Sequence, residues 1–169
     1  MRKALFLTVV LATVGVYLAM VLWSLPELAG MAGGNMPFDL RPMGYTPQDA
    51  RAFLSALGDE GRAFYRGVQH WLDLVFPGMF ALSLILAFSR LASRPLALIL
   101  SAVAAAAAGF DWAENAAVAG LLTDPAPTDA AIAAASRLTL LKSVAVTLAM
   151  MALVVVLLHR GWRRWRTAG

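Results

Sequence analysis

The sequence contains no cysteine and few charged residues. The absence of cysteine excludes disulfides, thiolate nucleophiles, and metal sites or clusters with cysteine ligands. Only 14% of the 169 residues are charged and 60% are hydrophobic. A soluble domain has about 25% charged and about 45–50% apolar residues. The composition therefore indicates an integral membrane protein.

Four long apolar stretches are each able to cross a bilayer as a helix, since about 20 such residues span its hydrocarbon core. We predict them at about residues 4–25, 69–89, 96–122 and 130–158. At about 20 residues per crossing they take roughly half of the chain, which leaves too little for a separate soluble domain. The sequence therefore predicts an all-α fold: one four-helix membrane domain over residues 1–169.

The first stretch is longer than the roughly 7–15 apolar residues of a secretory signal, so we interpret it as a retained helix. A signal-anchor and a cleaved signal peptide are the alternatives. The third stretch also exceeds the length that a perpendicular crossing needs, so we expect this helix to be tilted or to project beyond the lipid.

Lysine and arginine residues are distributed unevenly between the two sides of the predicted bundle. Eight of the 14 lie beside the chain ends and the short second connection: Arg2, Lys3, Arg90, Arg94, Arg160, Arg163, Arg164 and Arg166. All ten acids avoid this side. The positive-inside rule makes it cytoplasmic. We therefore expect both termini in the cytoplasm of a bacterial-type inner membrane, with the long connection 26–68 in the periplasm.

The long connection has a pattern typical of a short amphipathic helix. Thr46 is a suitable N-cap, Pro47 suits the first helical position, and Gly58 is a natural stop. Between them, four apolar residues fall on one helical face: Ala50, Phe53, Leu54 and Leu57. We predict a helix in the membrane interface or over the mouth of the bundle. It either shields hydrophobic surface or acts as a gating lid.

Pro77 lies inside the second predicted span and should kink it, because proline cannot donate the usual intrahelical hydrogen bond. The carbonyl group that loses its partner belongs to Asp73, four residues earlier. An unsatisfied carbonyl group is costly in a bilayer. We therefore predict another hydrogen-bond partner for this carbonyl oxygen.

Several ionisable side chains lie within the predicted spans, where each costs about 2.5–3.5 kcal/mol at the helix centre. Asp111, Glu114 and Asn115 share one face of the third span, at i, i+3 and i+4. Such groups should face one another or a wet cavity. The sequence predicts a ligand-binding site of seven residues: His70, Asp73, Asp111, Glu114, Asn115, Arg137 and Lys142. In it, three acids would face two strong bases.

Small residues fill positions 101–109, in the cytoplasmic half of the third span. Small side chains let neighbouring helices approach closely. We therefore expect a sealed inner half and a polar outer half. This arrangement is a cup that opens toward the periplasm, and it argues against a simple pore.

Three functions are open for this site, besides an ion-pair network that only fixes helix packing. The first is binding of a lipid headgroup or amphiphilic small molecule, in a binding or accessory role. The second is a membrane-embedded enzyme for a lipid-like substrate. In that case Asp111 or Glu114 is the general acid or base, and Lys142 or Arg137 stabilises negative charge. The third is proton-coupled transport of a small solute by an oligomer.

The expected partners are membrane lipids, with a homo-oligomer or an accessory subunit of a larger complex left open. Trp162 and Trp165 alternate with arginines after the fourth span, which is typical of an interfacial anchor and not of a nucleic-acid site. No metal-ligand spacing is present, so we predict no metal and no cofactor. At the level of architecture alone, the chain is similar to the emopamil-binding and sigma-2 receptor group, whose buried acids hold sterol-like or amine ligands.

Overall fold

The computed structural model describes residues 2–168, and the side chains of residues 3–166. Of the described residues, 88% are helical and none is in a strand. Four helices are long and apolar enough to cross a membrane: Lys3–Met31, Gly58–Leu91, Arg94–Thr123 and Asp129–Arg166. Each of them contains one predicted span, so the prediction of an all-α fold with four helices able to span a membrane is confirmed.

Two of the four crossings are divided into segments by a π-helical turn. The first comprises α1 (Arg2–Ala19), the π-helical turn η1 (Met20–Ser24) and α2 (Leu25–Met31). The second comprises α4 (Gly58–Phe64), the π-helical turn η3 (Tyr65–Gln69) and α5 (His70–Leu91). The other two crossings are the uninterrupted helices α6 (Arg94–Thr123) and α7 (Asp129–Ala168).

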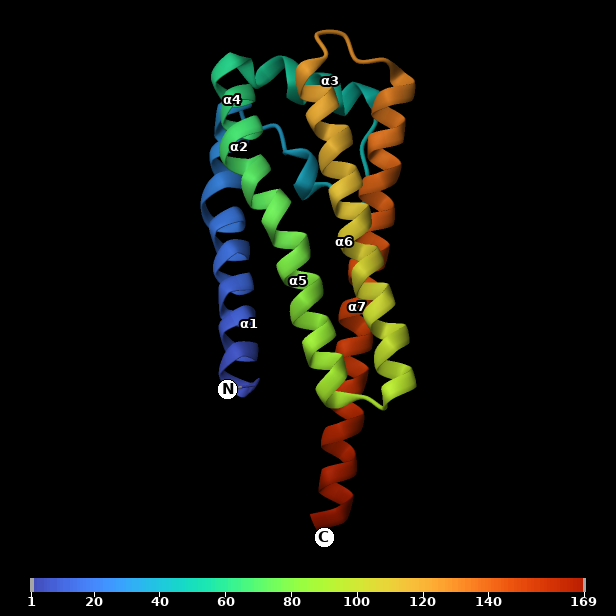
Figure 1. Ribbon diagram of the computed structural model, residues 1–169. Helices are drawn as coiled ribbons and strands as arrows, with labels where there is room; N and C mark the ends of the chain where they lie inside the picture. Colours follow the sequence, from blue (N-terminus) through green and yellow to red (C-terminus); the bar gives the residue numbers. More distant parts are fainter. Residues whose placement is uncertain (1, 169) are drawn as a thin grey trace.

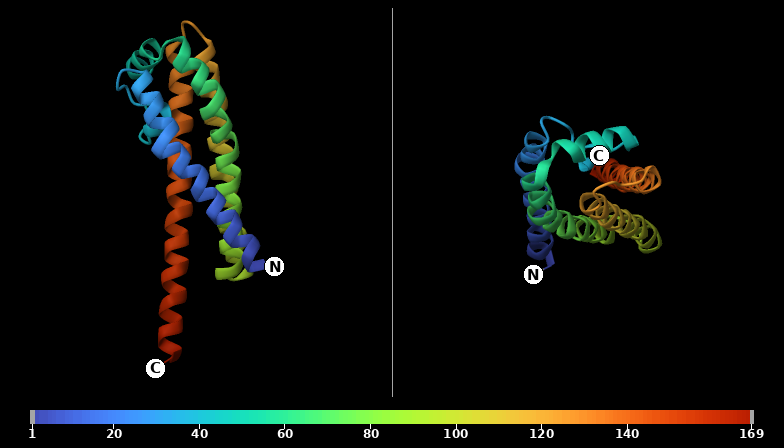
Figure 2. Two further views of the ribbon diagram at one scale, coloured as in Figure 1. Left: turned by 90° about the vertical axis from the view of Figure 1, so that its left-hand side faces the viewer. Right: turned by 90° about the horizontal axis from the view of Figure 1, so that it is seen from above.

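The start of α1 and the end of α7 lie at the same end of the bundle, which we name the termini end, and α7 extends farther than α1 there (Figure 1). The opposite end, the cap end, carries residues 32–57. Helix α6 packs between α5 and α7, whereas α1 packs mainly against α5. Helix α1 therefore lies at the edge of the bundle, as the view from above shows (Figure 2, right). The side view shows that α1 is inclined to α7 (Figure 2, left).

Residues 32–57 form a cap that contains a short 3-10 helix, η2 (Phe38–Leu40), and the helix α3 (Pro47–Ala56). Thr46 begins α3 with a capping box, in which Asp49 N donates to Thr46 Oγ1 at 3.1 Å and Thr46 N donates to Asp49 Oδ2 at 3.0 Å. The apolar face of α3 is buried: Ala50, Phe53, Leu54 and the following Leu57.

Two apolar cores hold the bundle together. The larger lies at the cap end and includes Leu28, Phe38, Phe53, Leu121 and Ile132. The smaller lies toward the termini end, between α5, α6 and α7, and includes Leu84, Phe88, Ala104 and Ala149. The alanines there allow the close approach of α6 that residues 101–109 predicted.

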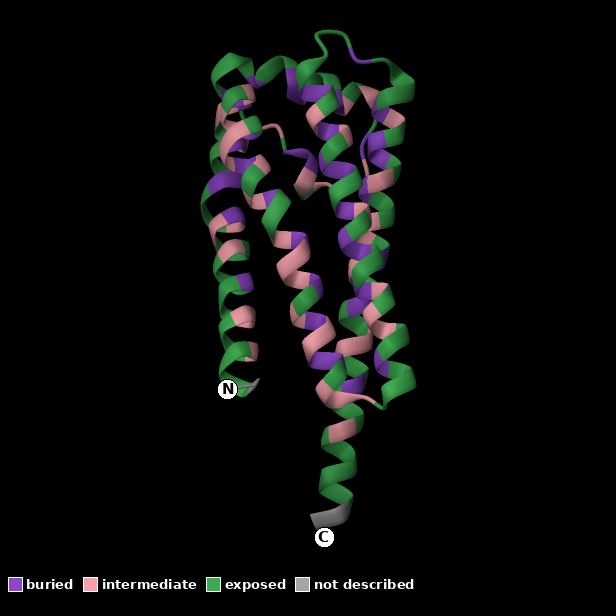
Figure 3. Cartoon of the chain, viewed as in Figure 1, coloured by how far each residue is buried: buried purple, intermediate pink, exposed green. Residues whose placement is uncertain are grey.

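Many residues of the four crossing helices are exposed (Figure 3), and large apolar residues are among them. They include Leu11 on α1, Val75 on α5, Ile99 on α6 and Val155 on α7. Soluble monomers rarely expose contiguous apolar patches larger than a few hundred Å². These surfaces fit a multi-pass membrane protein whose helices face lipid.

Candidate functional site

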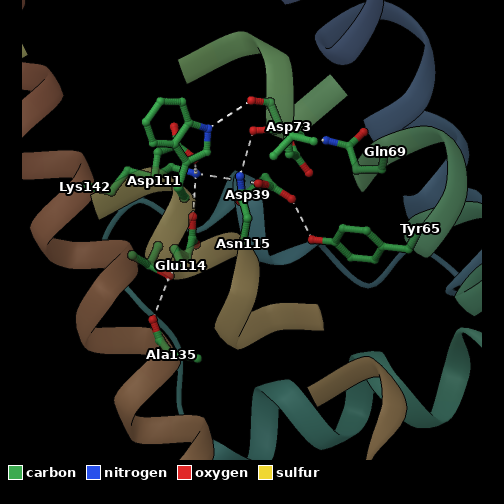
Figure 4. Close-up of polar contacts among 12 residues, drawn as sticks. Asp39, Tyr65, Gln69, Asp73, Asp111, Glu114, Asn115, Ala135 and Lys142 are labelled. Carbon is green, nitrogen blue, oxygen red and sulfur yellow. Dashed lines mark hydrogen bonds and ion pairs between the residues drawn. The ribbon is translucent and has the colours of Figure 1, made fainter. Parts of the chain in front are cut away.

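A group of charged side chains lies between the two apolar cores, where α5, α6, α7 and η2 meet (Figure 4). We name it the carboxylate cluster: Asp39, Asp73, Asp111, Glu114 and Lys142. Four of these five residues belong to the set predicted from the sequence. The fifth, Asp39, does not.

Lys142 on α7 lies at the centre of the cluster. Its Nζ is 2.5 Å from Glu114 Oε2, 3.1 Å from Asp111 Oδ1 and 3.6 Å from Asp39 Oδ1. The lysine side chain is 17% exposed and that of Glu114 only 1%. Hydrogen bonds between charged groups of this kind are about twice as strong as neutral ones.

Glu114 is held on both sides, because Thr139 Oγ1 on α7 donates to its second oxygen, Oε1, at 2.6 Å. Both carboxylate oxygens of this buried residue therefore have partners on α7. Asp111, one turn earlier on α6, has Lys142 as its hydrogen-bonded partner and also borders a cavity. Glu114 therefore fixes the position of Lys142, whereas Asp111 lies at the wall of the cavity.

Asp73 is positioned by a chain of hydrogen bonds that joins the two π-helical turns. Ser24 Oγ of η1 donates to Gln69 Oε1 of η3 at 2.6 Å, and Gln69 Nε2 donates to Asp73 Oδ1 at 2.8 Å. Ser24 and Gln69 are both fully buried. Single π-helical turns inside α-helices are frequent at functional sites, and here they bring two polar side chains into register with a carboxylate.

The backbone carbonyl of Asp73 has the second partner that Pro77 predicted. Asn115 Nδ2 on α6 donates to Asp73 O at 2.8 Å. Trp112, also on α6, donates from its indole nitrogen to the next carbonyl, Leu74 O, at 2.9 Å. The carbonyl group that Pro77 leaves without its helical partner is thus satisfied by a side chain from α6.

Asp39 enters the cluster from the cap, outside the four crossings. Tyr65 Oη donates to Asp39 Oδ2 at 2.6 Å, while Asp39 Oδ1 faces Lys142. Phe38 anchors this segment, since its buried ring lies 4.6 Å from that of Tyr45 and 5.1 Å from that of Phe53. Asp39 is not among the residues that the sequence predicted for the site. The sequence feature that could have indicated Asp39 is its position beside Phe38 and between two prolines, Pro37 and Pro42.

Two predicted residues lie elsewhere. Arg137 is exposed on α7, because it precedes Lys142 by five residues and so points about 140° away around the helix. His70 is half-buried and lines a different cavity of about 240 Å³ between α5 and α6. That cavity also contains Arg66 and reaches the other side of Asp73. Of the two expected strong bases, the structure places only Lys142 beside the acids, and a ligand-binding role for Arg137 and His70 stays a prediction.

The cluster instead contains four carboxyl groups and one ammonium. Fully ionised, it would carry a formal charge of −3. A buried charge without a partner costs several kcal/mol even after the protein relaxes around it. The cluster is therefore balanced only when it holds protons or a bound cation.

Tyr45 closes the cluster toward the cap. Its hydroxyl group is buried, and none of the described residues makes a hydrogen bond to it. Burial, followed by the negative charge of Glu114, raises the pKa of Tyr45. The hydroxyl group therefore stays neutral at physiological pH and can donate a hydrogen bond.

A cavity of about 220 Å³ opens from the cluster toward the space between α1 and α7. We name it the head cavity. Its polar wall consists of Asp39, Asp73, Asp111 and Lys142, and its apolar wall includes Tyr17, Met20, Phe76 and Val146. The volume suits a small charged group. Within the described residues, no three acids or histidines are arranged as a metal site.

A second cavity corrects the expectation of a sealed inner half. The contact between α5, α6 and α7 is close there, but about 460 Å³ remains between α1, α5 and α7. The small residues at 101–109 predict only how closely α6 approaches its neighbours α5 and α7. They do not predict how α1 packs.

Comparison of the chain with protein-family models, with curated proteins and with solved structures gave no match. The chemistry of the site is therefore inferred from its geometry.

Proposed function

We propose that this protein binds the cationic headgroup of an amphiphile, a lipid or a lipid-like small molecule, at the carboxylate cluster. The observation that carries the proposal is the excess of carboxyl groups: four of them line a buried site with one ammonium group, and three of the four pair with it. Ionisable residues at membrane depth are functional by default, because their cost has to be offset.

The residues have different roles in this proposal. Asp39, Asp73 and Asp111 line the head cavity and accept hydrogen bonds from the ligand's ammonium group. Lys142 holds Asp39 and Asp111 in place, and it is itself fixed by Glu114. This assignment leaves the cavity itself for the ligand. In a zwitterionic headgroup, Lys142 would face the anionic part.

The proposed setting is a bacterial-type inner membrane with both termini in the cytoplasm. Two arginines lie in contact at the termini end. The guanidinium group of Arg160 donates from Nη1 to the backbone carbonyl oxygen of Arg90 at 3.0 Å. Trp162 is exposed near the end of α7, with the Arg166 guanidinium group 4.9 Å from the centroid of its ring. These features support a cytoplasmic interface. The cap, with α3, then lies at the periplasmic side.

The test uses single-chain probes that share a dodecyl tail and differ in head charge. We expect the purified protein, in a non-ionic detergent, to bind dodecylammonium in preference to dodecyl sulfate, as counted by native mass spectrometry. Asp73→Asn and Asp111→Asn should each weaken dodecylammonium binding by roughly tenfold to a hundredfold. Losing a hydrogen bond to a charged group costs about 1.5–3 kcal/mol.

The matched control is Asp59→Asn, which removes an exposed carboxylate from α4. It should leave binding unchanged. Equal binding of the anionic and cationic probes, or full binding by both cluster variants, would refute the proposal. Chemical conversion of a bound amphiphile would favour a membrane-embedded enzyme that uses Asp111 or Glu114, and binding without conversion supports the binding role.

A further inference from the structure

The cavity between α1, α5 and α7 is apolar over almost its whole surface. It has a volume of about 460 Å³ and lies on the termini side of the head cavity. We name it the tail groove and define it by Phe6, Val10, Phe80, Ala87, Met150 and Leu153.

The few polar groups that border the tail groove already have partners. Thr13 Oγ1 is 2.8 Å from Val9 O and 2.9 Å from Ser83 Oγ. Arg90 Nη1 donates to Leu86 O at 2.7 Å, and its guanidinium group lies 4.7 Å from the centroid of the Phe6 ring. The groove therefore offers its occupant an apolar surface, as a hydrocarbon chain requires.

The tail groove continues the head cavity along the same three helices. On α5, Phe76 lines the head cavity and Phe80 lines the groove, and their rings stack at 5.7 Å. On α7, Val146 lines the head cavity and Met150, about one helical turn later, lines the groove. A chain attached to a headgroup in the head cavity therefore enters the groove directly.

The length of the groove fits one long chain. Leu157 at its far end lies 15 residues after Lys142 on α7, which is about 22 Å along a helix. This distance exceeds half of the hydrocarbon core, which is about 30 Å thick. The head cavity and the tail groove together are therefore long enough for one extended chain that begins at the cluster.

We propose that the tail groove holds the hydrocarbon chain of the amphiphile whose ammonium group occupies the carboxylate cluster. The ligand enters sideways from the lipid between α1 and α7, and its tail points to the termini end. This inference rests on the proposed function. It specifies the ligand as a long single-chain ammonium amphiphile, with charge complementarity at the head and an apolar surface along the tail.

The test is photo-crosslinking with dodecylammonium that carries a diazirine at the end of its chain. We expect labelled peptides from residues 6–14 of α1 and 150–157 of α7. Labels in the cap, or spread evenly over the lipid-facing helices, would overturn the assignment of the groove.

Two matched pairs of variants test the groove itself. Val10→Trp fills the groove from α1, whereas Leu11→Trp, at a position that is 68% exposed, places the same ring on the lipid side. Leu153→Trp and Leu148→Trp form the equivalent pair on α7. The groove-facing member of each pair should lower dodecylammonium labelling by about tenfold, and the outward-facing member should not change it.

The outcomes separate the two proposals. If the groove assignment alone is wrong, Asp73→Asn still abolishes labelling, but the labels fall outside the groove and both members of each pair behave alike. If the headgroup proposal is wrong, a dodecyl sulfate probe with the same diazirine labels as strongly as the ammonium probe, and Asp73→Asn has no effect.

Discussion

The two halves of the bundle use different means to bring the same four helices together. At the cap end, π-helical turns, a compensated proline and the cap bring polar side chains inward to one cluster. At the termini end, α5, α6 and α7 pack through alanines and aromatic rings, and α1 leaves an apolar groove. The irregular backbone is confined to the half that contains the charges. This contrast fits a ligand whose head and tail need different surroundings.

The largest effect is expected when the central charge of the carboxylate cluster, on Lys142, is removed. Lys142→Met removes the only ammonium group among four carboxyl groups, and it should lower the free energy of unfolding by about 3–5 kcal/mol. The measurement is reversible unfolding in mixed micelles. Arg137→Met, on the same helix but exposed, is the control and should have almost no effect. Equal losses for both variants would contradict the observed arrangement.

A smaller effect tests the compensation of the proline. Asn115→Ala removes the donor to Asp73 O and should cost about 1–3 kcal/mol of stability, because it leaves a buried carbonyl group unsatisfied. Pro77→Ala restores an intrahelical donor to the same carbonyl oxygen. In a double-mutant cycle, Asn115→Ala should therefore cost less in the Pro77→Ala background. Additive costs would mean that the two residues act independently.

The smallest expected effect concerns the cap. The Thr46 hydroxyl group, followed by its backbone N–H, lowers the pKa of Asp49. A carboxyl group whose pKa is lower in the folded state than in the unfolded state stabilises the folded state at every pH above the unfolded-state pKa. This stabilisation is lost as the pH falls through the folded-state pKa. The protection factors of the Thr46 and Asp49 amides, which correct exchange rates for the pH dependence of intrinsic exchange, should therefore fall in acid. In Asp49→Asn these protection factors should already be lower at neutral pH and should lose that response. An unchanged acid response would contradict the capping box.

The fold could be predicted from the sequence because hydropathy and length identify membrane-spanning helices with little ambiguity. The spacing of Asp111, Glu114 and Asn115 likewise placed them on one face of α6, and Pro77 predicted a partner for the Asp73 carbonyl. These inferences depend on helical geometry alone, which is the same in any context.

The remainder depends on contacts between segments far apart in the sequence. Asp39 reaches the cluster only because the cap folds back onto the bundle. No periodic pattern in the sequence predicts this contact between the cap and the bundle. The π-helical turns that bring Ser24 to Gln69 have no compositional signature. Arg137 is different. Its angle to Lys142 was available from the sequence, and helical spacing should have excluded it from the site.

The most direct test of the headgroup site is the binding of dodecylammonium to Asp39→Asn, measured by native mass spectrometry beside the wild type and Asp59→Asn. Asp39 lies outside the four crossings and shares its carboxylate between Tyr65 and Lys142. We expect binding to weaken by roughly tenfold or more in Asp39→Asn and to stay unchanged in Asp59→Asn. Wild-type affinity in Asp39→Asn would contradict a cation site completed by the cap.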